Sequence, residues 1–178
     1  MPRQLTPEQV GLILDDLVTE LTALASETSV YVIGGAAIAL LDPARRSTTD
    51  VDGWIGAAVD AMPAVERVRR RWGLDADWFN ANARMFAPSV VSADEVFVPI
   101  RTSGAVTLYA ARPDALLAMK LVAARRIDQD DIAFLLAHCD VRSVEQADDL
   151  LDRYYPGDSL SDIAVARVEA ALSEARFR

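Results

Sequence analysis

Two aspartates one residue apart are the residues of this chain best suited to chemistry. Asp50 and Asp52 flank Val51 in a segment where polar and apolar residues alternate. On a β-strand, residues i and i+2 point to the same side, about 6.5–7 Å apart. Carboxylates that close repel each other unless a cation lies between them or one is protonated. The spacing therefore suits Mg²⁺, which binds carboxylates together with the phosphate oxygens of a substrate.

A glycine pair precedes the aspartates. Residues 29–33 are a short, apolar, β-branched run that predicts a buried strand, and it ends at Gly34-Gly35 before a predicted short helix at 36–41. A helix N-terminus offers unpaired N–H groups to an anion, and glycines let a phosphate approach the backbone. Alone, each pattern is more typical of a plain turn or a solvated strand edge. Together they predict a phosphate site beside a two-metal phosphoryl-transfer site.

The order of these residues resembles a known superfamily. The chain reads Gly34-Gly35-Ala36-Ala37, then Arg45-Arg46, then Ser47-Thr48-Thr49 and Asp50-Val51-Asp52. This order is similar to that of the nucleotidyltransferase (DNA polymerase β-like) superfamily. The long spacing from glycine to aspartate looks like the branch that contains the AbiEii abortive-infection toxins and the mycobacterial MenT toxins.

A second segment supports the resemblance. Residues 116–136, LLAMKLVAARRIDQDDIAFLL, are similar to a later Lys-x-x-Ala-x-Arg…Asp-x-x-Asp element of that superfamily. The resemblance implies that Lys120 faces the nucleotide phosphates and that Asp131 orients nearby basic groups. The alternatives are a solvated helix lysine for Lys120 and, for Asp131, a carboxylate that complements the positive end of a helix.

The resemblance implies a Mg²⁺-dependent enzyme that moves a nucleoside monophosphate from an NTP to an acceptor hydroxyl, with Mn²⁺ as the alternative metal. The implied metal ligands are Asp50 and Asp52, which are also catalytic together with Lys120. The implied nucleotide-binding residues are Gly34, Gly35, Arg46, Thr49, Lys120 and Asp131. A third carboxylate from a neighbouring strand serves many of these enzymes as a general base, and the candidates are Asp77, Asp94 and Glu95.

The resemblance also implies a biological role. The chain looks like the toxin of a toxin–antitoxin pair, with tRNA as acceptor and a cognate antitoxin protein as partner. The basic residues Arg67, Arg69, Arg70 and Arg71 are either an RNA contact or a solvated helix end. Two alternatives stay open: a nucleotidyltransferase with a small-molecule or protein acceptor, and a non-catalytic member that acts as a binding or regulatory protein.

Composition limits the remaining classes. The 178 residues are 52% hydrophobic and 25% charged, which favours a folded core over disorder. The net charge of −9 argues against a general nucleic-acid coat protein. One cysteine, Cys139, excludes an internal disulfide, and one histidine excludes a site with two imidazoles. With neither a signal peptide nor a membrane-spanning apolar run, we expect a cytoplasmic protein without a membrane partner.

The predicted fold class is α+β. We expect a nucleotidyltransferase-like mixed sheet flanked by helices in residues 1–111, followed by a helical C-terminal region, residues 112–178, packed on it. Residues 75–86 are expected to be helical or irregular. The predicted strands are 29–33, 48–55, 96–101 and 105–110, the last two forming a hairpin. The predicted helices are 6–26, 36–41, 57–72, 113–126, 129–139, 143–154 and 159–176.

Overall fold

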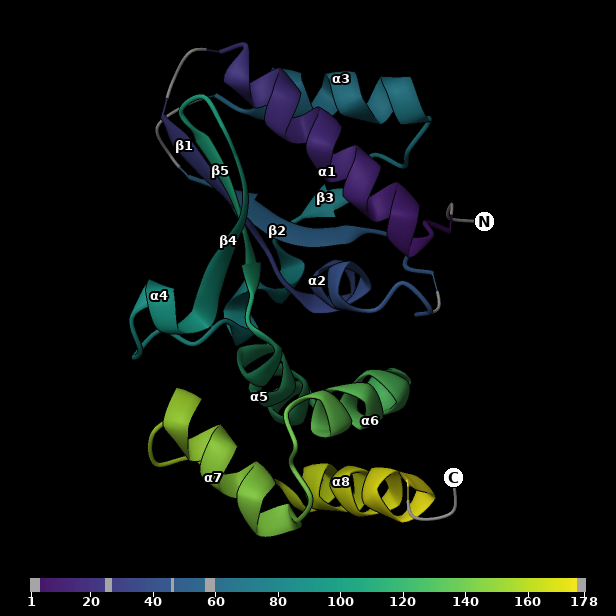
Figure 1. Cartoon of the computed structure of the whole chain (residues 1–178), viewed down its shortest axis with the longest axis vertical. Coiled ribbons are helices and arrows are strands. Elements are labelled where there is room, and N and C mark those ends of the chain that lie inside the picture. Colours follow the sequence, from purple (N-terminus) through teal and green to yellow (C-terminus); the bar gives the residue numbers. More distant parts are fainter. Residues whose placement is uncertain (1–3, 25–26, 46, 57–59, 176–178) are drawn as a thin grey trace. The chain divides into compact units, whose positions relative to one another are not determined.

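The computed structural model describes residues 4–24, 27–45, 47–56 and 60–175, and the chain divides into two compact units (Figure 1). Unit 1 comprises Met1–Met85 and Phe97–Ala111, and unit 2 comprises Phe86–Val96 and Arg112–Arg178. Residues 86–96 were predicted to belong to the α/β part. They join unit 2 because the hydroxyls of Tyr154 and Tyr155 donate to the carbonyls of Glu95 and Phe86.

Unit 1 contains a mixed five-stranded sheet with the order β3-β2-β1-β5-β4. The strands are β1 (Thr28–Val32), β2 (Val51–Ile55), β3 (Phe79–Asn80), β4 (Phe97–Ser103) and β5 (Val106–Ala111). Strand β1 pairs antiparallel with β2 and parallel with β5, while β2 pairs parallel with β3. Strands β4 and β5 form the predicted antiparallel hairpin.

Three helices accompany this sheet: α1 (Pro7–Thr22), α2 (Gly34–Leu41) and α3 (Met62–Trp72). Helix α1 begins at a capping box in which Thr6 and Gln9 each bind the other's backbone N–H. Its apolar stripe is fully buried, and α3 lies alongside it (Figure 1). The indole of Trp72 donates to Asp16 (2.7 Å), which ties the two helices together.

The two faces of the sheet differ in character. Strand alternation directs Val30, Val32 and Val51 into the core, where they are fully buried. The alternate residues of the same strands include Tyr31 and Trp54, which are half-buried. Asp52 lies on this second side of β2 together with Trp54, so the side of β2 away from the core carries the candidate chemistry.

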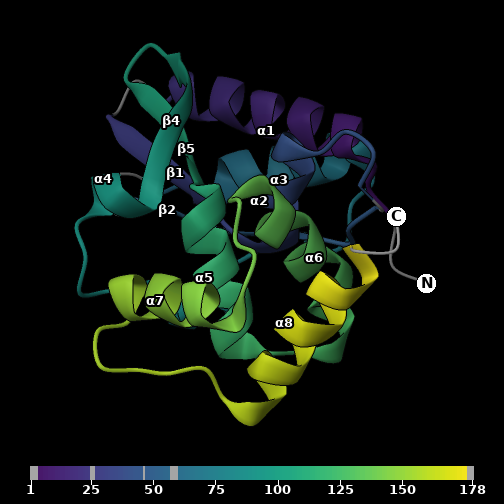
Figure 2. The same cartoon turned by 60° about the horizontal axis from the view of Figure 1, so that its bottom comes forward.

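Unit 2 is helical. Its helices are α4 (Ala93–Val96), α5 (Pro113–Ala123), α6 (Gln129–His138), α7 (Val144–Tyr154) and α8 (Asp162–Ala175). Helix α5 packs against α6 and α7, and α8 packs against the same two helices (Figure 2). Helix α5 is buried on most of its surface, as expected for the central member of the group.

The structure confirms the predicted α+β fold with a mixed sheet flanked by helices. Two elements were not predicted: strand β3 and helix α4, which are two and four residues long. Residues 75–86 contain β3 and a 3₁₀ helix, η1 (Asn82–Phe86). Such short elements have too few residues to show a periodicity, so the sequence pattern could not indicate them. Within the described part of the chain, no helix has the length and apolarity needed to cross a membrane.

A substitution at Gly53 on β2 tests how closely the strands of the sheet pack. A Cβ atom there would overlap the carbonyl oxygen of Tyr31 and lie 3.1 Å from the ring of Phe79. We expect Gly53→Ala to lower the free energy of unfolding by about 2–3 kcal/mol, because two neighbouring strands would have to move apart. Chemical denaturation of the purified protein measures the change.

Gly11 provides the matched control, because a Cβ atom there meets nothing within 4 Å and the residue lies inside α1. Gly11→Ala should raise the free energy of unfolding by roughly 0.5–1 kcal/mol, since alanine favours the helix. Equal effects of the two substitutions would contradict the close packing described for Gly53.

Candidate functional site

Gly34 and Asp52 lie against each other in unit 1. Gly34 begins α2 with a φ of 62°, a conformation that favours glycine. A Cβ atom on Gly34 would lie 2.9 Å from Oδ2 of Asp52. The backbone N–H of Ile33 donates to the carbonyl of Asp52 (2.9 Å), which holds the end of β1 to β2. The structure therefore brings the predicted glycine turn and the second aspartate together.

Gly35 lies beside a basic residue and a hydroxyl. A Cβ atom on Gly35 would be 3.1 Å from Nη2 of Arg45 and 3.2 Å from Oγ1 of Thr48. Arg46, which was predicted to bind the nucleotide, lies outside the described residues. Arg45 was missed as an individual site residue, although the Arg45-Arg46 pair was the sequence signal that pointed to it. The described part of the chain thus places a guanidinium at the glycine pair.

Asn80 is a second residue that sequence reasoning missed. Its side-chain amide donates to Oδ2 of Asp50 (2.8 Å), and the hydroxyl of Thr49 approaches Oδ1 of Asp50 (3.4 Å). Asn80 lies on β3, where its Cα is paired with that of Asp52. An asparagine within a segment expected to be helical or irregular gave no sequence signal for this role.

The three candidates for a third carboxylate lie outside the strands of the sheet. On β3, the neighbour of β2, the residue paired with Asp52 is an amide. Asp77 is exposed and contributes its backbone carbonyl to Asn80 (3.2 Å). Asp94 and Glu95 belong to α4 in unit 2. Ser92 donates two hydrogen bonds to Glu95, which lower the pKa of that carboxyl.

The side chains that could serve as metal ligands suit one kind of metal site. No group of three or more His, Cys, Asp or Glu residues converges within the described ranges. Asp52 on β2 and Asp50 just before it are both half-buried, and a site with two carboxylates fits a Mg²⁺ ion that takes its other ligands from substrate phosphates and water. Gly34 and Gly35 are also partly exposed, so a phosphate can reach the backbone beside Asp52.

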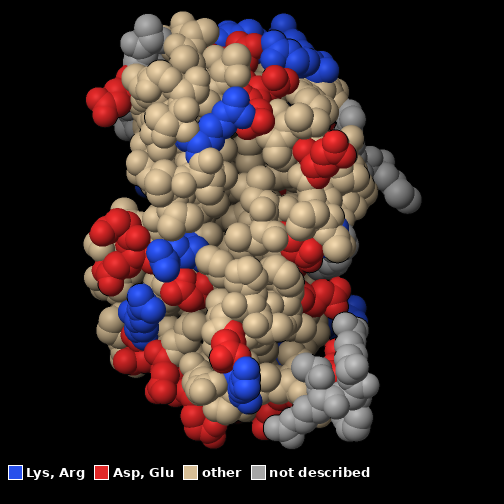
Figure 3. Space-filling view, viewed as in Figure 1, with Lys and Arg blue, Asp and Glu red and all other residues tan. Residues whose placement is uncertain are grey.

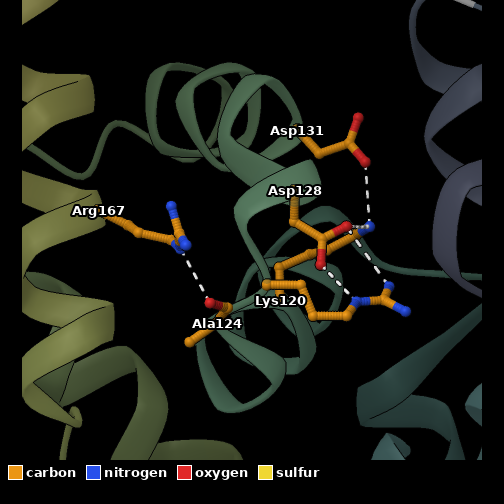
Figure 4. A network of polar contacts seen from close by, with 6 residues as sticks. Lys120, Ala124, Asp128, Asp131 and Arg167 are labelled. Carbon is orange, nitrogen blue, oxygen red and sulfur yellow. Dashed lines mark hydrogen bonds and ion pairs between the residues drawn. The ribbon is translucent and has the colours of Figure 1, made fainter.

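Lys120 is the only lysine in the chain, and it is buried in unit 2 (Figure 4). Its Nζ donates to Asp128 (2.5 Å) and Asp131 (3.0 Å), and the side chain is 7% exposed. Arg125 donates to the other oxygen of Asp128 (2.8 Å). Two cations thus face two carboxylates. The alternative interpretation of Lys120, a solvated lysine on a helix surface, is wrong because the side chain is buried.

The loop between α5 and α6 holds this cluster in place. Ala124 caps α5 with a φ of 45°, which turns the chain into the left-handed region. The guanidinium of Arg167 on α8 donates to the carbonyl of Ala124 (2.8 Å), as Figure 4 shows. Asp131 lies in the first turn of α6, so it both complements the helix dipole and pairs with Lys120.

The basic cluster of α3 carries its own acidic partners. Arg67 and Arg71 pair with Glu20 of α1 (2.5 and 2.6 Å), and Arg69 and Arg70 pair with Glu66 (2.6 and 2.7 Å). The two arginines lower the pKa of Glu66 to about 2. Figure 3 shows blue and red side by side at the top of the view. These ion pairs offset the positive charge that an RNA contact would need.

Cys139 lacks the features of a nucleophile. Burial, with a smaller effect of the Asp114 carboxylate, raises the pKa of its thiol to about 11. The thiol therefore stays protonated at neutral pH, as in a structural cysteine.

Comparison with known proteins identifies the family. A family model with the description "Nucleotidyltransferase of unknown function (DUF6036)" matches residues 12–159. The match includes the glycine pair, both aspartates, Asn80 and the Lys120 cluster. No curated protein and no solved structure matched the chain significantly.

The buried Lys120 cluster generates a stability prediction. Lys120→Met leaves Asp128 and Asp131 without their ammonium partner, so the free energy of unfolding should fall by about 3–5 kcal/mol. The double variant Lys120→Met/Asp131→Leu leaves Arg125 opposite Asp128 and should recover at least half of that loss. Denaturant unfolding of both variants measures the difference.

Arg142→Met is the matched control, since Arg142 is an exposed cation of the same unit. It should change the free energy of unfolding by less than about 0.5 kcal/mol. A Lys120→Met protein as stable as this control would contradict a buried charge cluster.

Proposed function

The chain belongs to the DUF6036 family of nucleotidyltransferases, and we propose that it is an active enzyme that transfers a nucleoside monophosphate from an NTP to an acceptor hydroxyl. One observation carries the proposal: the carboxylate of Asp52 lies at the Gly34 turn, two residues after Asp50. This arrangement supports a nucleotide whose phosphates bind at the glycines while its α-phosphate lies beside the aspartates.

The residues of unit 1 have distinct proposed roles. Asp50 and Asp52 hold Mg²⁺, or Mn²⁺ in its place, and Asn80 fixes the orientation of the Asp50 carboxylate. When bound, the metal would neutralise the phosphates and align the α-phosphate for in-line attack. The N–H groups of Gly34 and Gly35 bind the β- and γ-phosphates.

The residues around the glycine pair supply hydroxyls and positive charge. Arg45 and Thr48 lie at Gly35, and Arg45 adds positive charge there. Arg46 and Thr49 are proposed as further contacts of the nucleotide.

Lys120 and Asp131 belong to unit 2, and the resemblance of residues 116–136 is the support for their proposed role in nucleotide binding. Lys120 is the proposed cation for the pyrophosphate leaving group, and Asp131 orients it through their 3.0 Å ion pair. The double variant Lys120→Met/Asp131→Leu separates this role from stability. It should restore much of the folding free energy but none of the lost activity if Lys120 contacts the phosphates.

For the acceptor we propose tRNA, and for the biological role the toxin of a cytoplasmic toxin–antitoxin pair with a protein antitoxin. The support is the resemblance of residues 34–52 to the AbiEii and MenT branch. The ion-paired arginines of α3 add nothing to it, because their charge is offset within the protein. A small molecule or a protein hydroxyl would use the same metal and phosphate contacts.

A labelling experiment tests the reaction and the acceptor. The protein is incubated with each α-labelled NTP, with and without Mg²⁺, and with tRNA, a protein pool or an aminoglycoside panel. We expect label in tRNA, and its loss by at least about 100-fold in Asp52→Ala or after chelation of the metal. Asp149→Ala, which changes an exposed acid on α7, should transfer label as the wild type does.

The outcomes separate the possibilities. Label in the protein pool or the aminoglycoside would replace tRNA as the acceptor and keep the chemistry. Equal labelling by wild type and Asp52→Ala would refute the role of Asp52. Absence of any Mg²⁺-dependent NTP binding would favour a non-catalytic member of the family.

A further inference from the structure

We infer that unit 1 contains a site for a nucleobase, formed by the indole of Trp54 and the guanidinium of Arg84. The inference rests on the proposed function, because the base belongs to a nucleotide whose phosphate lies at Asp52. Neither the family description nor the motifs of the sequence assign such a site. Its evidence is a row of aromatic rings, one cation that lacks a carboxylate partner among the described residues, and the position of Trp54 on the same side of β2 as Asp52.

A row of stacked aromatic rings crosses the sheet. Trp54 of β2 stacks on Tyr31 of β1, with ring centroids 5.3 Å apart and planes 18° apart. Tyr31 stacks in turn on Tyr109 of β5, with 5.2 Å between centroids and 15° between planes. Phe97 of β4 meets Trp54 and Tyr31 edge-on. These contacts hold the indole rigidly, which lowers the entropic cost of binding another ring.

Trp54 ends this row and presents one face to Arg84. Tyr31 stacks on one face of the indole. A second group that lies over the ring therefore covers the other face. That group is Arg84, whose Cζ lies 5.1 Å from the ring centroid. Trp54 is half-buried and Arg84 is exposed, so this end of the row is open to solvent.

Arg84 differs from the arginines of α3. Arg67, Arg69, Arg70 and Arg71 each pair with a carboxylate. Among the described residues, the Arg84 guanidinium has the Trp54 ring as its contact and no carboxylate within ion-pair distance. Proteins bind unpaired bases by stacking them on aromatic rings or on arginine guanidinium planes, and this end of the row offers one of each.

The spacing along β2 matches a nucleotide. Asp52 and Trp54 point to the same side of the strand, about 6.5–7 Å apart. A phosphate held beside Asp52 therefore places its own nucleobase, one sugar away, within reach of the indole. The Cα pairing of Asp52 with Asn80 places β3, and the η1 helix that carries Arg84, on the same edge of the sheet.

The site opens by a small movement. A flat ring lies about 3.5 Å from the atoms on each of its faces, so a base between Trp54 and Arg84 requires about 7 Å between them. The present separation is 5.1 Å, and Arg84 lies on a short 3₁₀ helix with an exposed side chain. A shift of the guanidinium by about 2 Å is within the range of one rotamer change of an exposed residue.

Binding measurements test the site. Wild type, Arg84→Ala and Trp54→Leu are titrated with each Mg²⁺–NTP and with Mg²⁺–tripolyphosphate, which has phosphates but no base. We expect both variants to bind NTP roughly tenfold more weakly, the order of one lost stacking contact, and to bind tripolyphosphate as the wild type does. Arg70→Ala removes an exposed arginine and is the matched control.

Two further arms identify the source of the base and guard against misfolding. A short single-stranded RNA and its analogue with an abasic 3′ end are titrated in parallel. If the two substitutions weaken the binding of NTP alone, the site holds the base of the donor nucleotide. If they weaken only the binding of RNA with an intact 3′ base, the site holds the base of the acceptor.

A fluorescence measurement provides a second readout. NTP or RNA should also quench Trp54 fluorescence, and the quenching should be absent in Trp54→Leu. Arg84→Ala changes an exposed residue and keeps the test valid if Trp54→Leu unfolds.

Two negative results have different meanings. NTP and RNA that bind to Arg84→Ala and Trp54→Leu as tightly as to the wild type would overturn the nucleobase site alone. A wild-type protein that binds neither NTP nor tripolyphosphate would overturn the proposed function, and the nucleobase site with it.

Discussion

The close approach of Gly34 to Asp52 is the constraint on which the candidate site depends. The turn from β1 into α2 needs a positive φ at Gly34, and the carboxylate of Asp52 occupies the space that a side chain would fill. The hydrogen bond from Ile33 to the Asp52 carbonyl fixes the same junction from the backbone. A helix N-terminus and an acid are thereby held within contact distance, which is the pairing that a metal-bound phosphate requires.

The register of β2 links this junction to the rest of unit 1. Val51 and Gly53 face the core, and Gly53 has no room for a side chain against Tyr31 and Phe79. Asp52 and Trp54 therefore face the other side, where Tyr31 of β1 stacks on Trp54. Asn80 of β3 donates to Asp50, the residue just before β2. A shift of one residue would exchange the two sets, so packing of the core determines which side chains can act on a substrate.

Several of the cations described above are paired with carboxylates within the protein. The chain has a net charge of −9, yet the buried Lys120 is matched by Asp128 and Asp131, and the arginines of α3 are matched by acids. Pairing of this kind stabilises helix contacts and removes those cations from the surface field. Two other arginines lie at the features of the candidate site: Arg45 is beside Gly35, and Arg84 is over the Trp54 ring.

The sequence by itself determined the α+β class, most helices and strands, and the membership of Gly34, Gly35, Asp50 and Asp52 in one motif. These properties are local, because periodicity and short-range spacing carry them. Only the tertiary structure decided that Asn80 holds Asp50, that Arg45 lies at Gly35, that Lys120 is buried between two acids, and that Arg84 covers Trp54. Each of these contacts joins separate segments of the chain, and no local pattern records which segments the packing of a core brings together.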